Sequence, residues 1–375
     1  MGALNFVMAI TTTAIMGVGP AGHDPVQAAL DSAVNQAGAP GIAAEIRDGR
    51  HARFSSAGVS DLDTGRPRQP DERFRIGSTT KAFTAAVVLQ LAGEHRLSLD
   101  DSVEKWLPGL VDGNGYDGSR ITVWELLNHT SGIFSYTNDK DFFANGIGAA
   151  FFVHRYDHYD PEQLVRIALA TPPYAPPGQV FTYSNTDSIL AAMIVEKATG
   201  HSFTSELTRR IIRPLGLTGT SLPGDDPTIH GPHPVLYSTL FSGDPHPAIY
   251  DATDMNQSFA WSAGGMISTL GDLNRFFGAL LGGRLLRPAE QRELFTTVAT
   301  SGWIPHTRYG LGIFAQTLTC GVTVWGHGGA TYGSWSYVMG DRRGHHLIAV
   351  SVNGDWAGLT VFNNVLDAEF CPAAN

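Results

Sequence analysis

A hydroxyl and an amine stand three residues apart in the segment RIGSTTK, which runs from Arg75 to Lys81. A helix that starts at Ser78 places Lys81 one turn later on the same face, at the positive end of the helix dipole. A lysine whose pKa is lowered by burial can take the serine proton as the hydroxyl attacks a carbonyl group. S-x-x-K alone is also the pattern of an N-capping serine followed by an exposed lysine, so other segments must decide.

Two further segments carry side chains that suit the same chemistry. In PPGQVFTYSN, Tyr183 and Asn185 alternate to one side of a tight turn ahead of a helix, so a phenol and an amide point together. In VWGHGGA, an apolar strand ends in His327 and two glycines, which let a substrate or another backbone approach closely. Each of these segments alone is an ordinary loop or strand end.

Taken jointly and in this order, the three segments resemble the signatures of the serine penicillin-recognising acyl-enzyme family, S-x-x-K, Y-x-N and H-x-G. Two more segments are similar to that family, LLNHTSGI at 126–133 and WSAGGMIST at 261–269. The branch that the chain resembles most is that of class C β-lactamases and secreted D-alanyl-D-alanine carboxypeptidases. The resemblance implies an α+β fold of the β-lactamase/transpeptidase-like type from about residue 24 to residue 371.

The resemblance also implies a role for each matching side chain. Ser78 is the nucleophile, Lys81 is its activating base, and Tyr183 relays the proton to the leaving group. Asn185 helps to hold the lysine amine and the acyl side chain. His327 takes the place of the lysine of the third motif and supports Tyr183 electrostatically.

An oxyanion hole and a disulfide follow from the same resemblance. The backbone N–H groups of Ser78 and Ala330 form the hole, in which each essential donor contributes about 3–4 kcal/mol. Cys320 and Cys371 fall where the secreted carboxypeptidases join the strand before H-x-G to the last helix. We therefore expect this disulfide, and with it export to an oxidising compartment.

The residues expected beside the leaving group differ from those of the carboxypeptidase branch. In that branch an arginine and hydroxyl groups bind the free carboxylate of the substrate. Here Phe314 stands at the arginine position, and Gly328 and Ala330 replace the hydroxyl residues. Charge-assisted hydrogen bonds contribute about 1.5–3 kcal/mol each, so carboxylate-ended substrates and β-lactams are disfavoured. Arg308 could replace the missing arginine of this carboxylate clamp only if the register of its strand points its side chain into the site.

An apolar substrate-binding surface is expected in place of the clamp. The residues assigned to it are Phe314, Phe259, Trp261, Gly328 and Gly329. Such a surface suits an uncharged leaving group, as in an ester, an amide or an internal peptide.

We therefore expect a serine hydrolase that forms an acyl-Ser78 intermediate on a small-molecule or peptide acyl donor. Three alternatives stay open: a biosynthetic acyltransferase that passes the acyl group to an amine acceptor, a D-alanyl-D-alanine carboxypeptidase, and a non-catalytic binder on the same fold. The hydrolase is expected to be secreted or extracytoplasmic, and the acyltransferase cytoplasmic.

The elements that must position these residues lie at both ends of the chain and between them. Strand patterns dominate both ends, including one strand expected over 309–317, and helix patterns dominate the middle. This order predicts one antiparallel sheet built from both ends of the chain, with a helical lobe inserted. We assign the sheet lobe to 24–75 and 300–375 and the helical lobe to 76–299, together one catalytic domain with its cleft between the lobes.

Composition excludes several other classes of protein. The 375 residues are 43% hydrophobic and 16% charged, which is enough apolar material for a large core. The formal net charge of −10 provides no basic field for nucleic acid. Residues 1–23 are charge-free up to Gly22 and suggest a signal or an N-terminal arm, although no Lys or Arg opens the apolar run. We expect no integral membrane segment in the mature chain.

Motifs for metals and cofactors are weak. His154 and His158 stand four apart but lack the glutamate of H-E-x-x-H, and His230 and His233 lie in a Pro-Gly loop without a third ligand. Walker, dinucleotide-binding and G-x-S-x-G motifs do not occur in the sequence. We therefore expect neither a metal nor a cofactor.

Overall fold

The computed structural model of the chain describes residues 24–144, 150–242, 244 and 246–371. The predicted signal or N-terminal arm, residues 1–23, lies outside the described residues. Within the described part, no helix is long and apolar enough to cross a lipid bilayer.

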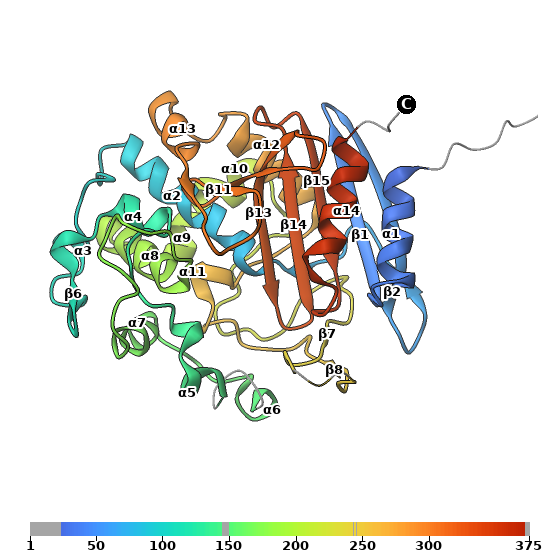
Figure 1. Cartoon of the computed structure of the whole chain (residues 1–375), viewed down its shortest axis with the longest axis horizontal. Coiled ribbons are helices and arrows are strands. Elements are labelled where there is room, and N and C mark those ends of the chain that lie inside the picture. The colour runs from blue at the N-terminus through green and yellow to red at the C-terminus, as the bar shows by residue number, and fades with distance from the viewer. Residues whose placement is uncertain (1–23, 145–149, 243, 245, 372–375) are drawn as a thin grey trace, which may run out of the picture.

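A nine-stranded antiparallel sheet forms the centre of the molecule (Figure 1). Its C-terminal strands meet its N-terminal strands where β15 pairs with β1, so both ends of the chain build one sheet. This arrangement confirms the predicted α+β fold of the β-lactamase/transpeptidase-like type. The strands, in order across the sheet, are β10 (Val298–Ala299), β11 (Thr307–Tyr309), β12 (Phe314–Thr317), β13 (Thr323–Thr331), β14 (Ser334–Gly340), β15 (His346–Val352), β1 (Gly41–Asp48), β2 (His51–Asp61) and β3 (Arg66–Pro67).

Helices α1 (Pro25–Asn35) and α14 (Gly358–Phe370) pack side by side on one face of this sheet (Figure 1). Asp24 caps α1 by accepting a hydrogen bond from the backbone N–H of Val26, and Pro25 stands at the first helical position, where it needs no hydrogen bond. The face of α1 that carries Val26 and Leu30 is buried against the sheet, which fixes this helix to it.

The other face of the sheet is covered by the helical lobe. Helix α2 is apolar on all sides and almost wholly buried, so it forms the centre of this lobe together with α8. The elements that follow β3 and precede β10 are β4 (Phe74–Arg75), η1 (Gly77–Thr79), α2 (Thr80–Gly93), α3 (Val103–Trp106), β5 (Asp112–Gly113), β6 (Tyr116–Asp117), η2 (Gly118–Arg120), α4 (Val123–Leu127), η3 (Tyr136–Asn138), α5 (Lys140–Phe142), α6 (Phe151–His154), α7 (Pro161–Leu169), α8 (Asn185–Thr199), α9 (Phe203–Leu207), η5 (Thr208–Ile212), α10 (Arg213–Leu215), β7 (Tyr237–Ser238), β8 (Tyr250–Asp251), α11 (Trp261–Gly264), β9 (Ile267–Ser268), α12 (Leu270–Leu281) and α13 (Pro288–Leu294).

The single strand predicted over 309–317 is wrong, because the chain reverses direction within it. The backbone N–H of Gly310 donates to the carbonyl of Ile313 at 2.7 Å, and this turn separates β11 from β12. Gly312 adopts φ +71°, and a Cβ there would lie 2.3 Å from the Cβ of Ala85, so helix α2 packs directly on the turn. The reversal changes which side chains of this segment face the site.

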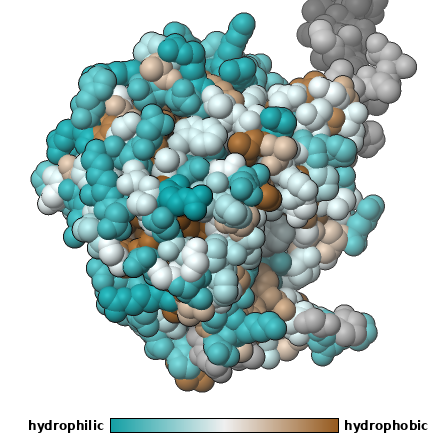
Figure 2. Space-filling model, turned by 60° about the vertical axis from the view of Figure 1, so that its left-hand side comes forward, coloured by the Kyte–Doolittle hydropathy of each residue, from teal (hydrophilic) through white to brown (hydrophobic). Residues whose placement is uncertain are grey.

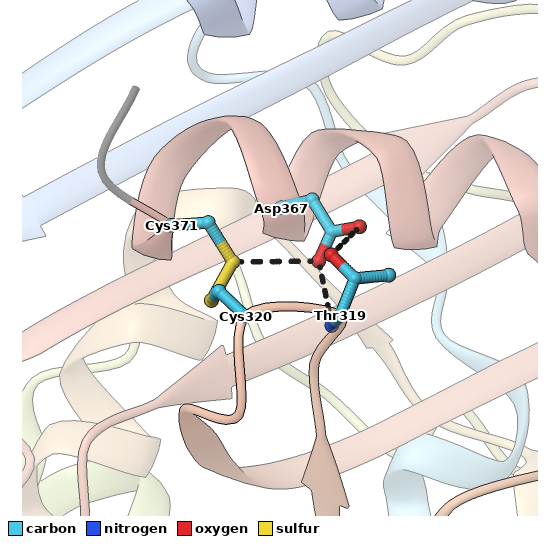
Figure 3. Close-up of a disulfide and its surroundings, with 4 residues drawn as sticks. All are labelled: Thr319, Cys320, Asp367 and Cys371. Atoms are coloured by element: carbon cyan, nitrogen blue, oxygen red, sulfur yellow. Dashed lines mark hydrogen bonds between the residues drawn. A yellow bond between two sulfur atoms is a disulfide. The ribbon is translucent and has the colours of Figure 1, made fainter. Parts of the chain in front are cut away.

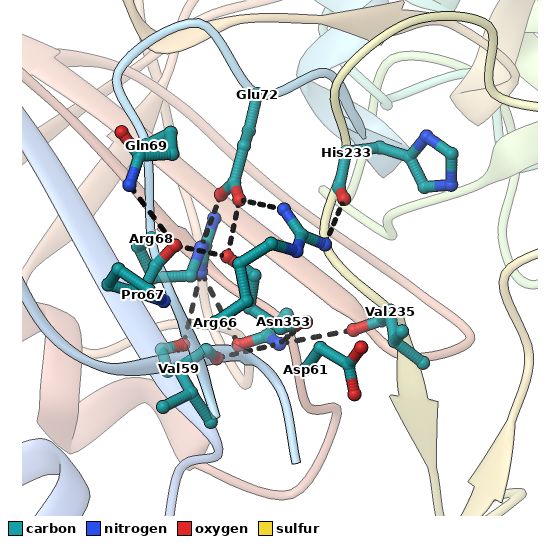
Figure 4. Close-up of polar contacts among 12 residues, drawn as sticks. Val59, Asp61, Arg66, Pro67, Arg68, Gln69, Glu72, His233, Val235 and Asn353 are labelled. Carbon is teal, nitrogen blue, oxygen red and sulfur yellow. Dashed lines mark hydrogen bonds and ion pairs between the residues drawn. The ribbon is translucent and has the colours of Figure 1, made fainter. Parts of the chain in front are cut away.

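A buried ion pair in the segment after β3 lies beside strand β15 (Figure 4). Arg68 donates to Glu72 at 2.7 Å, and both side chains are 1% exposed. Arg68 also donates to the hydroxyl of Ser351 at 3.2 Å, while Asn353 donates to the carbonyl of Val235 at 3.1 Å. The segment that leads into β7 is thereby fixed to the end of β15.

The outer surface on the face shown in Figure 2 is mostly hydrophilic, and hydrophobic side chains occur there in separate patches.

At the far end of the sheet, Cys320 and Cys371 form the predicted disulfide, with Cα atoms 5.8 Å apart (Figure 3). Beside it, Asp367 of α14 accepts a hydrogen bond from the hydroxyl of Thr319 at 2.9 Å. The turn between β12 and β13 is thus attached twice to the last helix.

Reduction of this disulfide is expected to lower the free energy of unfolding by about 2–4 kcal/mol, because the bridge restricts the unfolded chain. Urea unfolding with and without a thiol reductant measures the difference. The Cys320→Ser/Cys371→Ser double variant is the control and should not respond to the reductant. Equal unfolding midpoints for oxidised and reduced wild-type protein would contradict the prediction.

Candidate active site

The nucleophile turn, η1, lies against strand β13 with almost no space between the two backbones. A Cβ on Gly329 would lie 2.0 Å from the carbonyl oxygen of Ile76 and 2.6 Å from the backbone nitrogen of Ser78. Gly77 has φ +50°, and a Cβ there would lie 2.7 Å from the backbone nitrogen of Ala330. Two glycines therefore bring the backbone amides of Ser78 and Ala330 together, as the predicted oxyanion hole requires.

The amine of Lys81 is buried at the N-terminal end of α2 and has three polar neighbours, each from a different element. Its Nζ lies 2.7 Å from Oδ1 of Asn185, 2.6 Å from the carbonyl oxygen of Ala263 and 3.1 Å from Oγ of Ser78. A neutral amine has two N–H donors and one lone pair. Donation to Asn185 and Ala263 leaves the lone pair to accept the proton of the Ser78 hydroxyl.

Burial lowers the pKa of Lys81 to about 7, because the charged amine would lose its hydration. A large fraction of Lys81 is therefore neutral at physiological pH and can act as a general base. The sequence prediction for Ser78, Lys81 and Asn185 thus corresponds to one hydrogen-bonded group in the structure.

Tyr183 completes this group from the other side of Ser78. Burial raises the pKa of its hydroxyl, partly offset by a hydrogen bond with Ser78, so the phenol stays protonated and can donate to a leaving group. The Nζ of Lys81 lies 4.9 Å from the centre of the Tyr183 ring. The indole of Trp303 stacks on the same ring at 5.3 Å with an interplanar angle of 16°.

Both ring nitrogens of His327 are hydrogen-bonded. Its Nδ1 donates to the carbonyl of Gly328 at 2.5 Å, which leaves Nε2 to accept from the hydroxyl of Tyr309 at 2.9 Å. Burial, with a smaller effect of the Lys81 charge, lowers the pKa of His327 to about 3. The ring is therefore neutral at physiological pH, and its two nitrogens bond to Gly328 and Tyr309. The electrostatic support of Tyr183 by His327 stays a prediction.

A second buried histidine, His129, packs behind Tyr183, and it was not assigned a role from the sequence. Nδ1 of His129 lies 2.9 Å from Oδ2 of Asp187, and the Ser131 hydroxyl donates to Oδ1 of Asp187 at 2.5 Å. Burial raises the pKa of Asp187 and lowers that of His129, which favours a neutral acid hydrogen-bonded to a neutral imidazole. The His129 ring packs 4.5 Å from that of Tyr183 and so helps to hold it.

A cavity of about 190 Å³ opens beside Ser78. Phe259 lines it as predicted, but most of its wall comes from residues that the sequence did not single out. None of the described lining residues carries a charge. The residues that line the cavity are Ser78, Tyr136, Thr137, Phe143, Asn185, Phe241, Phe259, Ala260, Ala263, Gly264, Ala330, Thr331 and Tyr332.

Two residues predicted at the substrate, Phe314 and Trp261, lie elsewhere, and so does Arg308, the conditional substitute for the carboxylate clamp. Phe314 is fully buried in the sheet core, with its ring 5.2 Å from Trp303, because the turn before β12 changes its register. Trp261 packs on Phe203 at 5.6 Å rather than into the cavity. Arg308 is exposed and donates to the hydroxyl of Thr297 at 2.9 Å.

The outward position of Arg308 means that it does not form a carboxylate clamp in this structure. Gly329 borders the nucleophile turn, and a Cβ on Gly328 would lie 2.4 Å from the ring of Tyr337. Neither glycine is among the residues that line the cavity, so their assignment to the substrate surface stays a prediction. Among the residues that the structure describes, no group of three or more His, Cys, Asp or Glu side chains is placed to hold a metal ion.

A serine beside a buried lysine amine, a buried phenol and two converging backbone amides form the arrangement that a serine acyl-enzyme requires. The chain matches the family model described as Beta-lactamase over residues 26–366, and it therefore belongs to the β-lactamase family. It is an enzyme of the serine hydrolase or acyltransferase type within that family.

Curated relatives match only part of this chain. It is 30% identical over 176 residues to Protein flp of Staphylococcus aureus strain N315, a match that covers 47% of this chain and 33% of that protein. It is 34% identical over 165 residues to penicillin-binding protein 4* of Bacillus subtilis strain 168, covering 44% and 34% respectively. The matches span about a third of the length of these relatives.

Solved structures match over nearly the whole chain. A D-stereospecific amidohydrolase from Streptomyces sp. is 46% identical with a TM-score of 0.87, covering 94% of this chain and 99% of that chain. A D-amino acid amidase from Ochrobactrum anthropi SV3, complexed with L-phenylalanine amide, is 24% identical with a TM-score of 0.77, covering 92% and 97%. The second likeness shows the shared fold alone.

The pH dependence of kcat/KM should report the state of Lys81. The neutral amine is the active form, so the rate is expected to fall as the pH drops below about 7. Asn185→Asp places a carboxylate at the position 2.7 Å from Nζ, which favours the charged amine. We expect this variant to move the acid limb of the profile upward by about 1–3 pH units. An unchanged acid limb would show that another group controls the rate.

Gly329→Ala is expected to slow acylation of Ser78 by about ten-fold or more, because the new methyl group overlaps the backbone of the nucleophile turn. The labelling rate of Ser78 with a fluorophosphonate measures the effect. Gly93→Ala is the control, since its Cβ meets only flexible side chains, the carboxylate of Glu290 at 3.0 Å and Cδ of Arg287 at 3.4 Å. Equal labelling rates in both variants would contradict the close approach.

Proposed function

We propose that this enzyme is a serine amidohydrolase that acylates Ser78 with the acyl group of a neutral amide or ester and then hydrolyses the acyl-enzyme. The observation that carries the proposal is the contact between Nζ of Lys81 and Oγ of Ser78, at 3.1 Å, with both N–H donors of the neutral amine already engaged. Proton transfer from Ser78 to Lys81 makes Ser78 nucleophilic. Tyr183 then donates its phenolic proton to the departing nitrogen or oxygen and regains a proton from Lys81, which returns both side chains to their starting states.

The surroundings of Tyr183 support a neutral leaving group. Trp303 stacks on the Tyr183 ring and also contacts Phe314 and Tyr309, so this side of the site is an aromatic wall. A carboxylate against that wall would lose its hydration without gaining a charged partner from the wall. Ammonia, small amines and alcohols carry no such penalty when they leave.

The acyl side of the site supports an apolar substrate. The cavity beside Ser78 is walled by aromatic rings, among them Tyr136, Phe259 and Tyr332. The 46% identity to a D-stereospecific amidohydrolase over nearly the whole chain supports a D-configured acyl group. We therefore propose amides and esters of apolar D-amino-acid derivatives as substrates.

We also propose that the enzyme acts outside the cytoplasm. The support is the Cys320–Cys371 disulfide, a bond that forms and persists in oxidising compartments. Titration of free thiols in protein recovered from its native compartment tests this point. Two free thiols in that protein would contradict the proposal.

The decisive assay compares substrates that differ only in the leaving group. The primary amide of a D-amino-acid derivative should be hydrolysed with a kcat/KM about 100-fold higher than the same scaffold ending in free D-alanine, because no described cation faces the leaving group. Ser78→Ala should abolish both turnover and fluorophosphonate labelling. A preference for the free carboxylate, or for the L-enantiomer of the amide, would refute the corresponding part of the proposal.

A further inference from the structure

Exposed aromatic side chains gather at the mouth of the catalytic cavity. Phe143 and Phe241 line the cavity and are 37% and 45% exposed. Beyond them, Phe152 of α6 and Tyr250 of β8 are 45% and 40% exposed. Apolar side chains concentrated on one surface next to a cavity are typical of a ligand-binding surface.

A series of ring contacts connects the cavity to these outer residues. The ring of Tyr332, in the cavity wall, lies 4.6 Å from Phe151 and 5.1 Å from Phe241. Phe151 lies 5.2 Å from Phe152, which lies 5.2 Å from Tyr250. We call Phe152, Phe241 and Tyr250 the aromatic rim.

Strand β13 leads from the nucleophile toward this rim. Ala330 borders the nucleophile turn, Thr331 ends the strand and lines the cavity, and Tyr332 follows with its contacts to Phe151 and Phe241. An acyl donor held at Ser78 and extended along the end of β13 therefore reaches the aromatic rim.

The absence of charged side chains among the described lining residues disfavours an acyl donor with a free α-ammonium group. A free amino acid amide has an ammonium group one carbon from the scissile carbonyl, and none of the described lining residues offers it a carboxylate. Burying that cation there is unfavourable. Acylation of the α-nitrogen removes the charge and at the same time extends the substrate toward the rim.

We propose that the aromatic rim is a second substrate subsite, which binds an apolar or aromatic acyl group carried on the α-nitrogen of the acyl donor. This inference rests on the proposed function and narrows its substrates to N-acylated or peptidyl amides. No covalent step beyond acylation of Ser78 and its hydrolysis is involved.

Three amides of one apolar D-amino acid test the subsite: the free amine, the N-acetyl and the N-(3-phenylpropanoyl) derivative, all of which release ammonia. In wild-type enzyme kcat/KM should rise on N-acetylation, which removes the charge. It should rise again by about ten-fold for the phenylpropanoyl derivative, whose ring is buried at the rim.

Phe152→Ala and Tyr250→Ala should each lower the ratio of kcat/KM between the phenylpropanoyl and acetyl substrates by about five-fold or more. Val322→Ala truncates a 38% exposed residue directly before β13, at the opposite end of that strand from Thr331, and should keep the wild-type ratio. A wild-type ratio in both rim variants overturns the subsite while leaving the proposed function in place.

Failure of the proposed function gives a different result. If none of the amides is hydrolysed but a fluorophosphonate still labels Ser78, the amidohydrolase assignment is wrong. The rim is then tested by the labelling rates of fluorophosphonates with a phenylalkyl or a methyl group. A preference for the phenylalkyl probe that both rim variants lose supports the subsite, and a preference that they keep overturns it.

Discussion

The burial of one lysine amine without an adjacent ionised partner is the constraint on which the rest of the site depends. An ammonium group is expensive to bury, so Lys81 titrates near neutrality instead of near its usual pKa of 10.5. The neutral amine still needs acceptors for its two N–H groups. Asn185 of α8 and the carbonyl of Ala263 in α11 supply them, which requires α2, α8 and α11 to meet at one point.

The same constraint explains why the neighbouring histidines are neutral. A protonated imidazole close to Lys81 would raise the cost of any charge on the amine, and burial holds both His129 and His327 in their neutral forms. Tyr309 donates to His327 and Asp187 is paired with His129, so each ring keeps a hydrogen bond without keeping a charge. The positions of these rings are thereby fixed by hydrogen bonds and ring contacts alone.

Sequence patterns predicted the fold and the central group well, because both depend on local signals in a fixed order. Ser78 and Lys81 share a face through helical spacing, and strands at both ends imply the sheet. The leaving-group side could not be predicted in the same way. The reversal at 310–313 depends on the contact between Gly312 and α2, which is remote in sequence. Trp303 lies in a loop whose approach to Tyr183 has no local signature.

The distribution of charge then determines which substrates suit the site. Burial lowers the pKa of Lys81 to about 7, so the neutral amine beside Ser78 gains its charge when it takes the serine proton. In the proposed reaction the oxyanion develops near the amides of Ser78 and Ala330, and the amine that has taken the serine proton partly balances its charge. A charged group on the substrate, at either the leaving-group or the acyl side, would perturb the amine in its buried setting. A neutral substrate leaves the pKa of Lys81 near neutrality, so the amine can still take up the serine proton.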